Sequence, residues 1–227
     1  MKSTLVILSV NEIGGLQTIY EKIPINSVDE VFAMDGGSTD GTLEFYERNR
    51  IRYIIQKKPG RGSAILEAPQ HAKGDILVYF SPDGNEDPDE IPKLVGKINE
   101  GYDLAIASRF INGGLSDDSD DPLLIRRFGN NFFTFLSNIF FHTGVTDAIN
   151  GLRAIRKKSL LKLDQDASGH EIEFQMTIRC ALNNMKIAEI PTHEDQRIIG
   201  KRKANTWIMG VRFSLFFLKE LWKSKKK

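Results

Sequence analysis

The first half of the chain alternates short apolar runs, rich in β-branched residues, with stretches that have the composition of helices. The runs predict strands at residues 5–10, 30–35, 51–56, 76–80 and 104–107. The stretches between them predict helices near residues 16–22, 42–49, 64–72 and 90–99. Alternation at this spacing is typical of βαβ units, so it indicates an α/β fold with a mostly parallel sheet flanked by helices.

The second half of the chain has a different pattern. Residues 113–122 are rich in glycine and aspartate and predict a loop. They are followed by predicted helices at 128–141 and 172–183 and by a predicted strand at 187–191. We expect these segments to complete one α/β domain over residues 1–200.

The C-terminal segment, residues 201–227, is strongly basic and predicts an amphipathic helix over 205–223. Helical spacing places a row of apolar side chains on one face of this helix, namely Ile208, Val211, Leu215, Leu218 and Trp222. We expect it to form an extension of the main domain.

The composition excludes several kinds of protein. The formal net charge is +1, whereas proteins that bind nucleic acid usually have a strong basic excess. The single cysteine, Cys180, allows no intrachain disulfide, and this favours a reducing, cytoplasmic compartment. Met1 leads directly into a strand-like segment with no signal peptide, and no apolar run reaches the roughly 18–20 residues that span a membrane.

Three polar or glycine-rich segments follow predicted strands: Asn11-Glu12, residues 35–42 (Asp-Gly-Gly-Ser-Thr-Asp-Gly-Thr) and residues 81–85 (Ser-Pro-Asp-Gly-Asn). In parallel α/β sheets, ligands bind beyond the carboxyl ends of the strands. Glycines let the backbone approach a ligand closely, and fixed carboxylates can bind ribose hydroxyls or base nitrogens. Each segment alone is more often an ordinary strand-to-helix turn, but together they predict a ligand site.

These segments resemble family 2 glycosyltransferases of the GT-A fold, and within them the dolichyl-phosphate mannose synthase group. MDGGSTDGT at 34–42 is similar to the family's DDGSTDGT signature, and SRFINGG at 108–114 is similar to its GSRY-x-x-GG element. Further similar segments occur in the family's order at residues 5–12, 60–65, 72–94, 146–157 and 171–197. The resemblance covers nearly the whole chain and implies inverting transfer of a sugar from a GDP- or UDP-sugar.

The resemblance also implies which residues bind the donor. Nucleotide contacts are expected from Ser9, Asn11, Glu12, Asp35, Gly37, Ser38, Gly62 and Asp83. A Mg²⁺ or Mn²⁺ ion is expected at Asp83 and Asn85. Ser81 stands where the family has the first acid of its DxD motif, so one carboxylate plus phosphate oxygens must suffice and affinity for free metal should be weak.

The acceptor implied by the resemblance is a polyprenyl or dolichyl phosphate. Its phosphate is already largely ionised at neutral pH and needs cations rather than a strong base. The residues expected to bind it are Ser108, Arg109, Arg126, Arg127 and Arg202. A hydroxyl acceptor would instead need a carboxylate base, for which the candidates are Asp147, Glu171 and Glu173. The expected catalytic set is Asp83, Arg109, Asp147 and Glu171.

Two segments are unusually apolar, the phenylalanine-rich residues 128–141 and the stretch 207–222, which has basic residues on both sides. Basic residues beside aromatic and aliphatic ones suit a helix lying on an anionic lipid surface. We therefore expect peripheral contact with the cytoplasmic face of a membrane. The alternative is that the two helices pack on each other or in a homodimer interface.

Two other functions remain open from the sequence. One is a family 2 transferase that uses a hydroxyl on a glycan or small molecule. The other is a nucleotide-sugar-binding protein with weak catalysis, which is suggested by Ser81.

Overall fold

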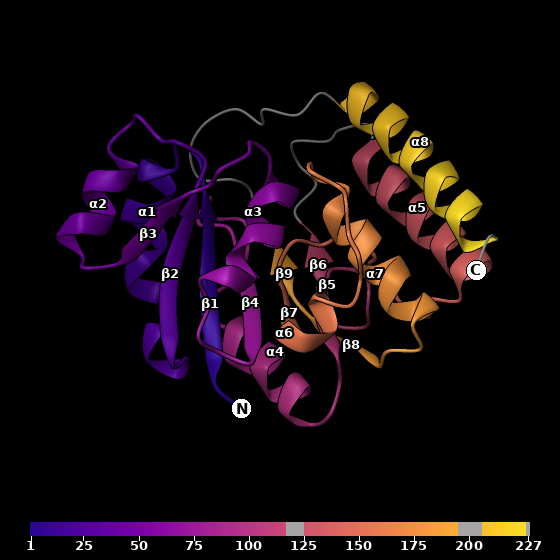
Figure 1. The fold of residues 1–227 in the computed structure, drawn as a ribbon, viewed down its shortest axis with the longest axis horizontal. Coiled ribbons are helices and arrows are strands. Elements are labelled where there is room, and N and C mark those ends of the chain that lie inside the picture. Colours follow the sequence, from indigo (N-terminus) through magenta and orange to yellow (C-terminus); the bar gives the residue numbers. More distant parts are fainter. Residues whose placement is uncertain (117–124, 195–205, 226–227) are drawn as a thin grey trace.

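The computed structural model describes residues 1–116, 125–194 and 206–225, and a seven-stranded sheet lies at its centre (Figure 1). The strand order is β3-β2-β1-β4-β7-β5-β8. The strands are β1 (Ser3–Ser9), β2 (Glu30–Asp35), β3 (Arg52–Ile55), β4 (Ile76–Phe80), β5 (Leu104–Ser108), β7 (Arg153–Arg156) and β8 (Ile187–Pro191). A separate parallel pair joins β6 (Leu115–Ser116) to β9 (His193–Glu194).

Helices cover both faces of the sheet. One face carries α1 (Ile13–Ile19), α2 (Thr42–Arg48) and α4 (Glu90–Asn99). The other carries α3 (Arg61–Glu67), α5 (Ile125–Phe141), α6 (Lys157–Leu160), α7 (Ile172–Leu182) and α8 (Thr206–Ser224). Short 3₁₀ turns occur at Tyr20–Lys22, Ile25–Ser27 and Ala68–Gln70. The predicted α/β fold with a mostly parallel sheet is confirmed.

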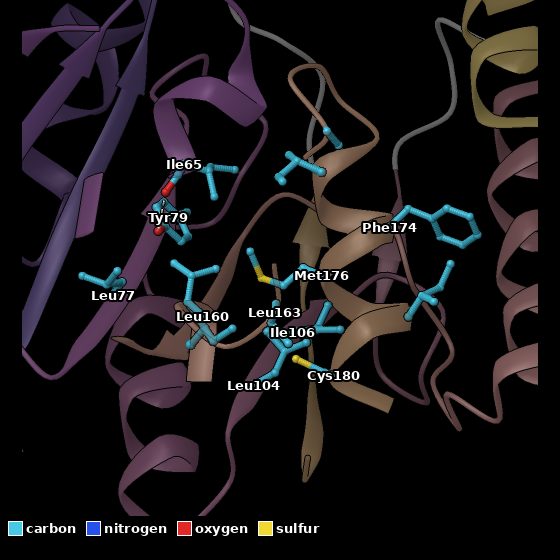
Figure 2. Close-up of a cluster of buried hydrophobic side chains, with 14 of the residues drawn as sticks. Ile65, Leu77, Tyr79, Leu104, Ile106, Leu160, Leu163, Phe174, Met176 and Cys180 are labelled. Atoms are coloured by element: carbon cyan, nitrogen blue, oxygen red, sulfur yellow. Dashed lines mark hydrogen bonds between the residues drawn. The ribbon is translucent and has the colours of Figure 1, made fainter. Parts of the chain in front are cut away.

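The strands alternate between two apolar clusters, one on each face of the sheet. On β4, Leu77 and Tyr79 belong to the cluster drawn in Figure 2, whereas Ile76, Val78 and Phe80 belong to the cluster on the other face. Both sets of side chains are fully buried, which explains why this strand is apolar at every position. The Tyr79 hydroxyl finds a partner by donating to the Ile65 carbonyl at 3.0 Å.

Cys180 lies in the same cluster in Figure 2, as expected for a packing residue. Burial raises the pKa of its thiol to about 12.

Strand β7 was not predicted from the sequence. It lies between β4 and β5 and runs antiparallel to both. Its four residues begin and end with arginine, a polar pattern that does not predict a buried strand. The Arg153 side chain is nevertheless fully buried, and it donates hydrogen bonds to the carbonyls of Asn150 and Glu173. Burial lowers the pKa of Arg153 to about 10. Because β7 is reversed, the loop before it lies at the carboxyl ends of β4 and β5.

Helix α8 packs along α5, at the end of the molecule away from β2 and β3 (Figure 1). Phe213, Phe216 and Phe217 are buried, and the ring of Phe213 lies 5.4 Å from that of Phe133 on α5. The predicted apolar row is exposed: Val211, Leu215, Leu218 and Trp222 are 58–64% exposed, while the Ile208 side chain lies outside the described part of the chain. The helix is therefore apolar on two faces.

A buried ion pair ties α8 to α7. Glu220 is 1% exposed, and its carboxylate accepts hydrogen bonds from Arg179 Nε at 2.9 Å and Nη2 at 2.8 Å. Within the described residues, none of the helices has the length and apolar character needed to cross a bilayer.

Candidate functional site

One large cavity, of about 1060 Å³, opens where the carboxyl ends of β1, β2, β4 and β5 meet and continues between α5 and α8. Its polar end is lined by charged residues that include Glu12, Arg61, Asp83, Arg109 and Glu173. Its apolar end is lined mainly by side chains of α5 and α8, among them Phe128, Phe132, Phe133, Met209, Phe213 and Leu215.

Asp35, at the end of β2, holds its own loop together. Its side chain is fully buried, and Oδ1 accepts hydrogen bonds from the backbone N–H groups of Gly37 (2.8 Å) and Ser38 (2.6 Å). Oδ2 accepts from the hydroxyls of Ser9 (2.8 Å) and Ser38 (2.7 Å). A carboxylate accepts about four hydrogen bonds, so Asp35 is satisfied by the protein. Gly36, rather than Asp35, lies on the cavity wall.

The turn after β1 is bonded to the same loop. Asn11 adopts a left-handed φ of 53°, its N–H donates to the Ser38 hydroxyl at 2.8 Å, and its side-chain oxygen accepts from Thr39 N–H at 2.8 Å. Asp40 accepts from Ile13 N–H at the start of α1. The first two polar segments therefore meet at one edge of the sheet.

The third segment reaches this edge through a close contact at Gly15. A Cβ at Gly15 would lie 2.0 Å from the Pro82 carbonyl oxygen and 3.1 Å from the Asp83 Cα, so only glycine lets α1 approach the loop after β4. Asp83, Asn85 and Glu12 all line the cavity. The three segments therefore lie together at one edge of the sheet, as a common ligand site requires.

The donor set at this loop fits a divalent cation. Asp83 supplies a carboxylate, and Asn85 Oδ1 is a buried oxygen that accepts no hydrogen bond from the described residues. Both are hard oxygen ligands of the kind that Mg²⁺ and Mn²⁺ accept. Among the described residues no three His, Cys, Asp or Glu side chains could hold an ion by themselves, so a bound ion would need oxygens from a ligand.

Arg61, at the start of α3, occupies the space beside Ser81. Its Nη1 donates to the Ser81 hydroxyl at 2.6 Å, and its Nε donates to Glu173 on α7. Nη2 lies 3.9 Å from Glu86 Oε1. Burial opposes the positive charge, but Glu173 and Glu86 outweigh it and raise the pKa of Arg61. Where the family has an acid at position 81, this chain therefore places a guanidinium against a hydroxyl.

Glu86 belongs to the loop after β4, and its side chain is buried. Its Oε2 accepts from Ser81 N–H at 2.7 Å. Burial raises the pKa of Glu86 to about 8, although Arg61 acts in the opposite direction. A Cβ at Gly151 would meet Arg61 Nη2 at 2.5 Å and Glu86 Oε1 at 2.8 Å, so this glycine leaves room for both charged groups.

Arg109, just after β5, is held by two carboxylates. It donates to Asp147 from Nε (2.7 Å) and Nη2 (3.0 Å), and to Glu194 on β9 from Nη1 (2.8 Å). Burial disfavours its charge, but Asp147 and Glu194 raise the pKa of Arg109 well above its ordinary value. Asp147 is fully buried. Asp147, which was expected to act as a base, is therefore the ion-pair partner of Arg109, which was expected to bind the acceptor substrate.

The predicted site residues divide into two groups by position. Those that line the cavity are Ser9, Glu12, Asp83, Asn85, Arg109, Arg126 and Arg127. Those that do not line it are Asn11, Asp35, Gly37, Ser38, Gly62, Ser108, Asp147 and Glu171. Most members of the second group hold the lining loops: the Ser108 hydroxyl, for example, bonds to Thr146 at 2.6 Å. Arg202 lies outside the described residues.

Of the two glutamates on or next to α7, Glu173 lines the cavity, whereas Glu171 pairs with Arg212 of α8 at 3.3 Å. The two side chains therefore do not face the same site. The residue named as catalytic, however, is the one that does not line the cavity. Arg61, Glu86 and Glu194 were not identified from the sequence. Arg61 and Glu194 bond to residues far along the chain, Glu173 and Arg109.

Known proteins with a similar fold include glucosyl-3-phosphoglycerate synthase from Mycobacterium tuberculosis, in a crystal structure with phosphoglyceric acid. The two structures agree with a TM-score of 0.76 over 96% of this chain and 79% of that one, at 20% sequence identity. This similarity establishes the GT-A fold.

Curated relatives include the glycosyltransferase AglJ of Haloferax volcanii, 29% identical over 71% of this chain and 52% of the relative. Another is the polyprenol monophosphomannose synthase of Mycolicibacterium smegmatis, 28% identical over 76% of this chain and 69% of the relative. A third is the dolichol-phosphate mannosyltransferase of Pyrococcus furiosus, 26% identical over 89% and 59%. The chain spans about half the length of AglJ. Residues 4–164 match Glycosyl transferase family 2, and the chain belongs to that family.

Proposed function

We propose that this chain transfers a sugar from a nucleoside-diphosphate sugar to the phosphate of a polyprenyl-type lipid, with inversion at the anomeric carbon. An oxygen of the acceptor phosphate attacks the anomeric carbon and forms the new C–O bond. The bond from that carbon to the diphosphate breaks, and the nucleoside diphosphate leaves with the electron pair. Two relatives are named for transfer to a polyprenol or dolichol phosphate, which supports this acceptor class.

The observation that carries the proposal is the two-ended cavity. Its polar end suits a charged donor and an acceptor phosphate, and its apolar end, between α5 and α8, suits a hydrocarbon chain. Because both ends belong to one continuous space, a lipid phosphate can lie with its head beside the donor and its tail between the two helices.

The charges at the polar end favour an acceptor that is already ionised. The three carboxylates expected as bases for a hydroxyl acceptor are each paired with an arginine: Asp147 with Arg109, Glu173 with Arg61 and Glu171 with Arg212. A carboxylate held by an arginine is poorly placed to take a proton from a hydroxyl, whereas a phosphate acceptor needs no base. Arg126 and Arg127 of α5 line the cavity between its two ends, where they can bind that phosphate.

The same charges call for a divalent cation. Five carboxylates, Asp83, Glu86, Asp147, Glu173 and Glu194, surround Arg61 and Arg109. A diphosphate brings further negative charge, so Mg²⁺ or Mn²⁺ at Asp83 and Asn85 would offset the repulsion. When bound, the ion would stabilise the charge that develops on the leaving diphosphate.

The outer surface of the apolar end suits contact with a membrane. Phe128, Phe135 and Phe140 of α5 are 48–72% exposed, as is the row of Leu215, Leu218 and Trp222 on α8. The sequence is basic at this end, with four lysines among residues 223–227. Exposed apolar groups beside lysines suit an anionic lipid surface, from which the acceptor could enter between the helices.

The proposal is tested by supplying UDP- and GDP-sugars with Mn²⁺ and three acceptors: a polyprenyl phosphate, the matching unphosphorylated polyprenol, and a free sugar. We expect a glycolipid product only with the polyprenyl phosphate. Product from the free sugar alone would show that the acceptor is a hydroxyl group. Donor binding with no product from any acceptor would favour a nucleotide-sugar-binding protein, the reading that Ser81 suggests.

A further inference from the structure

Glu194, on the short strand β9, lies between the two sides of the polar end. Its Oε2 accepts a hydrogen bond from Arg109 Nη1 at 2.8 Å, and its Oε1 accepts one from Asn85 Nδ2 at 3.4 Å. Its side chain is 17% exposed and lines the cavity. One carboxylate therefore contacts both the arginine after β5 and the amide in the loop after β4.

The contact with Glu194 determines which way the Asn85 amide points. If the amide were reversed, its oxygen would face a carboxylate oxygen, which is repulsive, so Nδ2 must face Glu194. Asn85 Oδ1 then points elsewhere, and it is buried without a hydrogen-bond partner among the described residues. A buried polar atom of this kind requires a water or an ion.

Glu194 is itself held firmly. Arg109, which donates to it, is fixed by two further hydrogen bonds to the fully buried Asp147. The backbone of Glu194 pairs with Ser116 of β6. The chain of contacts thus runs from Asp147 through Arg109 and Glu194 to Asn85. Residues that orient a metal ligand in this way commonly tune metal affinity without touching the ion.

We propose that Glu194 is a positioning residue that holds the Asn85 amide with Oδ1 toward a divalent cation carried by the donor diphosphate. This inference rests on the proposed function, because it assumes a donor that binds together with an ion. It assigns Glu194 no contact with the reacting atoms. It also links the ion to Arg109 on the acceptor side through one carboxylate.

The test measures Mn²⁺ binding to the full chain by electron paramagnetic resonance, in the presence of UDP or GDP. Glu194→Gln keeps the shape of the side chain but leaves one acceptor oxygen, which cannot serve both Arg109 and Asn85. We expect this variant to bind Mn²⁺ about 10-fold more weakly or worse, within the range typical of lost outer contacts at metal sites. Nucleotide binding without Mn²⁺ should be unchanged.

A second variant separates positioning from general damage. In the pair Glu194→Gln with Asn85→Asp, the glutamine amide can donate to a carboxylate at position 85, and either carboxylate oxygen can face the ion. We expect Mn²⁺ affinity to recover to within about threefold of the wild-type value, and by more than Asn85→Asp alone gains over the wild type, a non-additive result that signals a direct interaction between the two positions. The control is Glu30→Gln, which removes another carboxylate paired with an arginine, Arg52, away from the cavity.

The outcomes are distinct. Equal Mn²⁺ affinity in the wild type and in Glu194→Gln would overturn the positioning role and leave the proposed function intact. Failure of the paired variant to recover, with its melting temperature preserved, would also overturn that role. If the wild type binds no Mn²⁺ with either nucleotide, the ion-dependent donor site is wrong and the positioning role falls with it.

Discussion

The two ends of the cavity are held together by different kinds of interaction. At the polar end, side chains from loops on the rigid sheet bond to one another or to neighbouring backbone, as Asp35 and Arg109 do. At the apolar end, α5 and α8 meet through phenylalanine rings and leave large apolar side chains exposed. Directional bonds fix positions to fractions of an ångström, whereas apolar contacts permit sliding. The polar end is thus held by directional bonds, while the wall proposed for a lipid tail can adapt.

The largest expected effect is the loss of sugar transfer when Asp83 at the polar end is replaced. We predict that Asp83→Ala lowers the initial rate of sugar transfer by at least about 1000-fold, because loss of an ion that stabilises the leaving diphosphate is worth several kcal/mol. The measurement is the transfer rate at saturating Mn²⁺. Asp89→Ala removes an exposed carboxylate from the same loop and should retain activity. Near-normal activity in Asp83→Ala would remove the metal role assigned to this residue.

The next effect concerns how the apolar end is attached. Glu220→Ala removes the buried carboxylate partner of Arg179, which is 8% exposed, and leaves it only the more distant, half-exposed Asp166 at 3.5 Å. Removing one partner of a buried ion pair typically costs about 3–5 kcal/mol. We therefore expect the free energy of unfolding in urea to fall by about 3 kcal/mol.

The matched control is Lys219→Ala on the same helix. Lys219 and its partner Asp166 are each 43% exposed, so this pair should contribute less than about 1 kcal/mol. Equal effects from the two variants would mean that α8 is not anchored through Glu220.

A smaller effect concerns the buried carboxyl group of Glu86 at the polar end, whose charged form destabilises the fold. The pKa of Glu86 is raised by burial from 4.5 to about 8. A raised carboxyl pKa contributes stability below pH 4.5 that is lost as the pH rises toward 8. In metal-free buffer, Glu86→Gln should therefore gain stability relative to the wild type between pH 5 and pH 6.5, by about 2 kcal/mol, given about 1.4 kcal/mol for each pKa unit. Parallel pH profiles of urea unfolding would contradict this.

The sequence predicted the parts of the site that are local in the chain. The loop from Asp35 to Thr42 closes on itself through contacts between residues two or three apart, so its signature is visible in a short motif. The ion pairs that complete the site join residues far apart: 112 positions separate Arg61 from Glu173, and 109 separate Asn85 from Glu194. A short sequence motif cannot predict such contacts, because they form only when the folded sheet brings the two segments together.

The same reasoning explains the details of the fold that were not predicted from the sequence. Strand β7 was missed because it has only four residues and begins and ends with arginine, and its place depends on its neighbours β4 and β5. In α8 the predicted apolar row exists, yet a second set of apolar residues, Phe213, Phe216 and Phe217, forms the buried contact. Periodicity finds apolar faces, but it cannot choose between two of them.

The smallest effect sharpens the role of the outward face of α8. Leu215 and Leu218 are 64% and 58% exposed, so replacing both by serine should leave the core intact. Full burial of one leucine is worth about 1.5–3 kcal/mol, and shallow insertion recovers only part of that. We therefore expect the double variant to partition onto anionic vesicles about 10-fold more weakly, as measured by cosedimentation.

Leu161→Ser is the control for that experiment, because Leu161 is equally exposed, at 64%, but follows α6 and does not line the cavity. If both variants sediment like the wild type, the outward face does not contact lipid. Sedimentation velocity then distinguishes the remaining explanation: a second copy of the chain covering this face would give a wild-type dimer that Leu215→Ser with Leu218→Ser converts to a monomer. If the wild type is monomeric and does not bind vesicles, the apolar end of the cavity opens to water. The proposal of a lipid acceptor would then have no structural support.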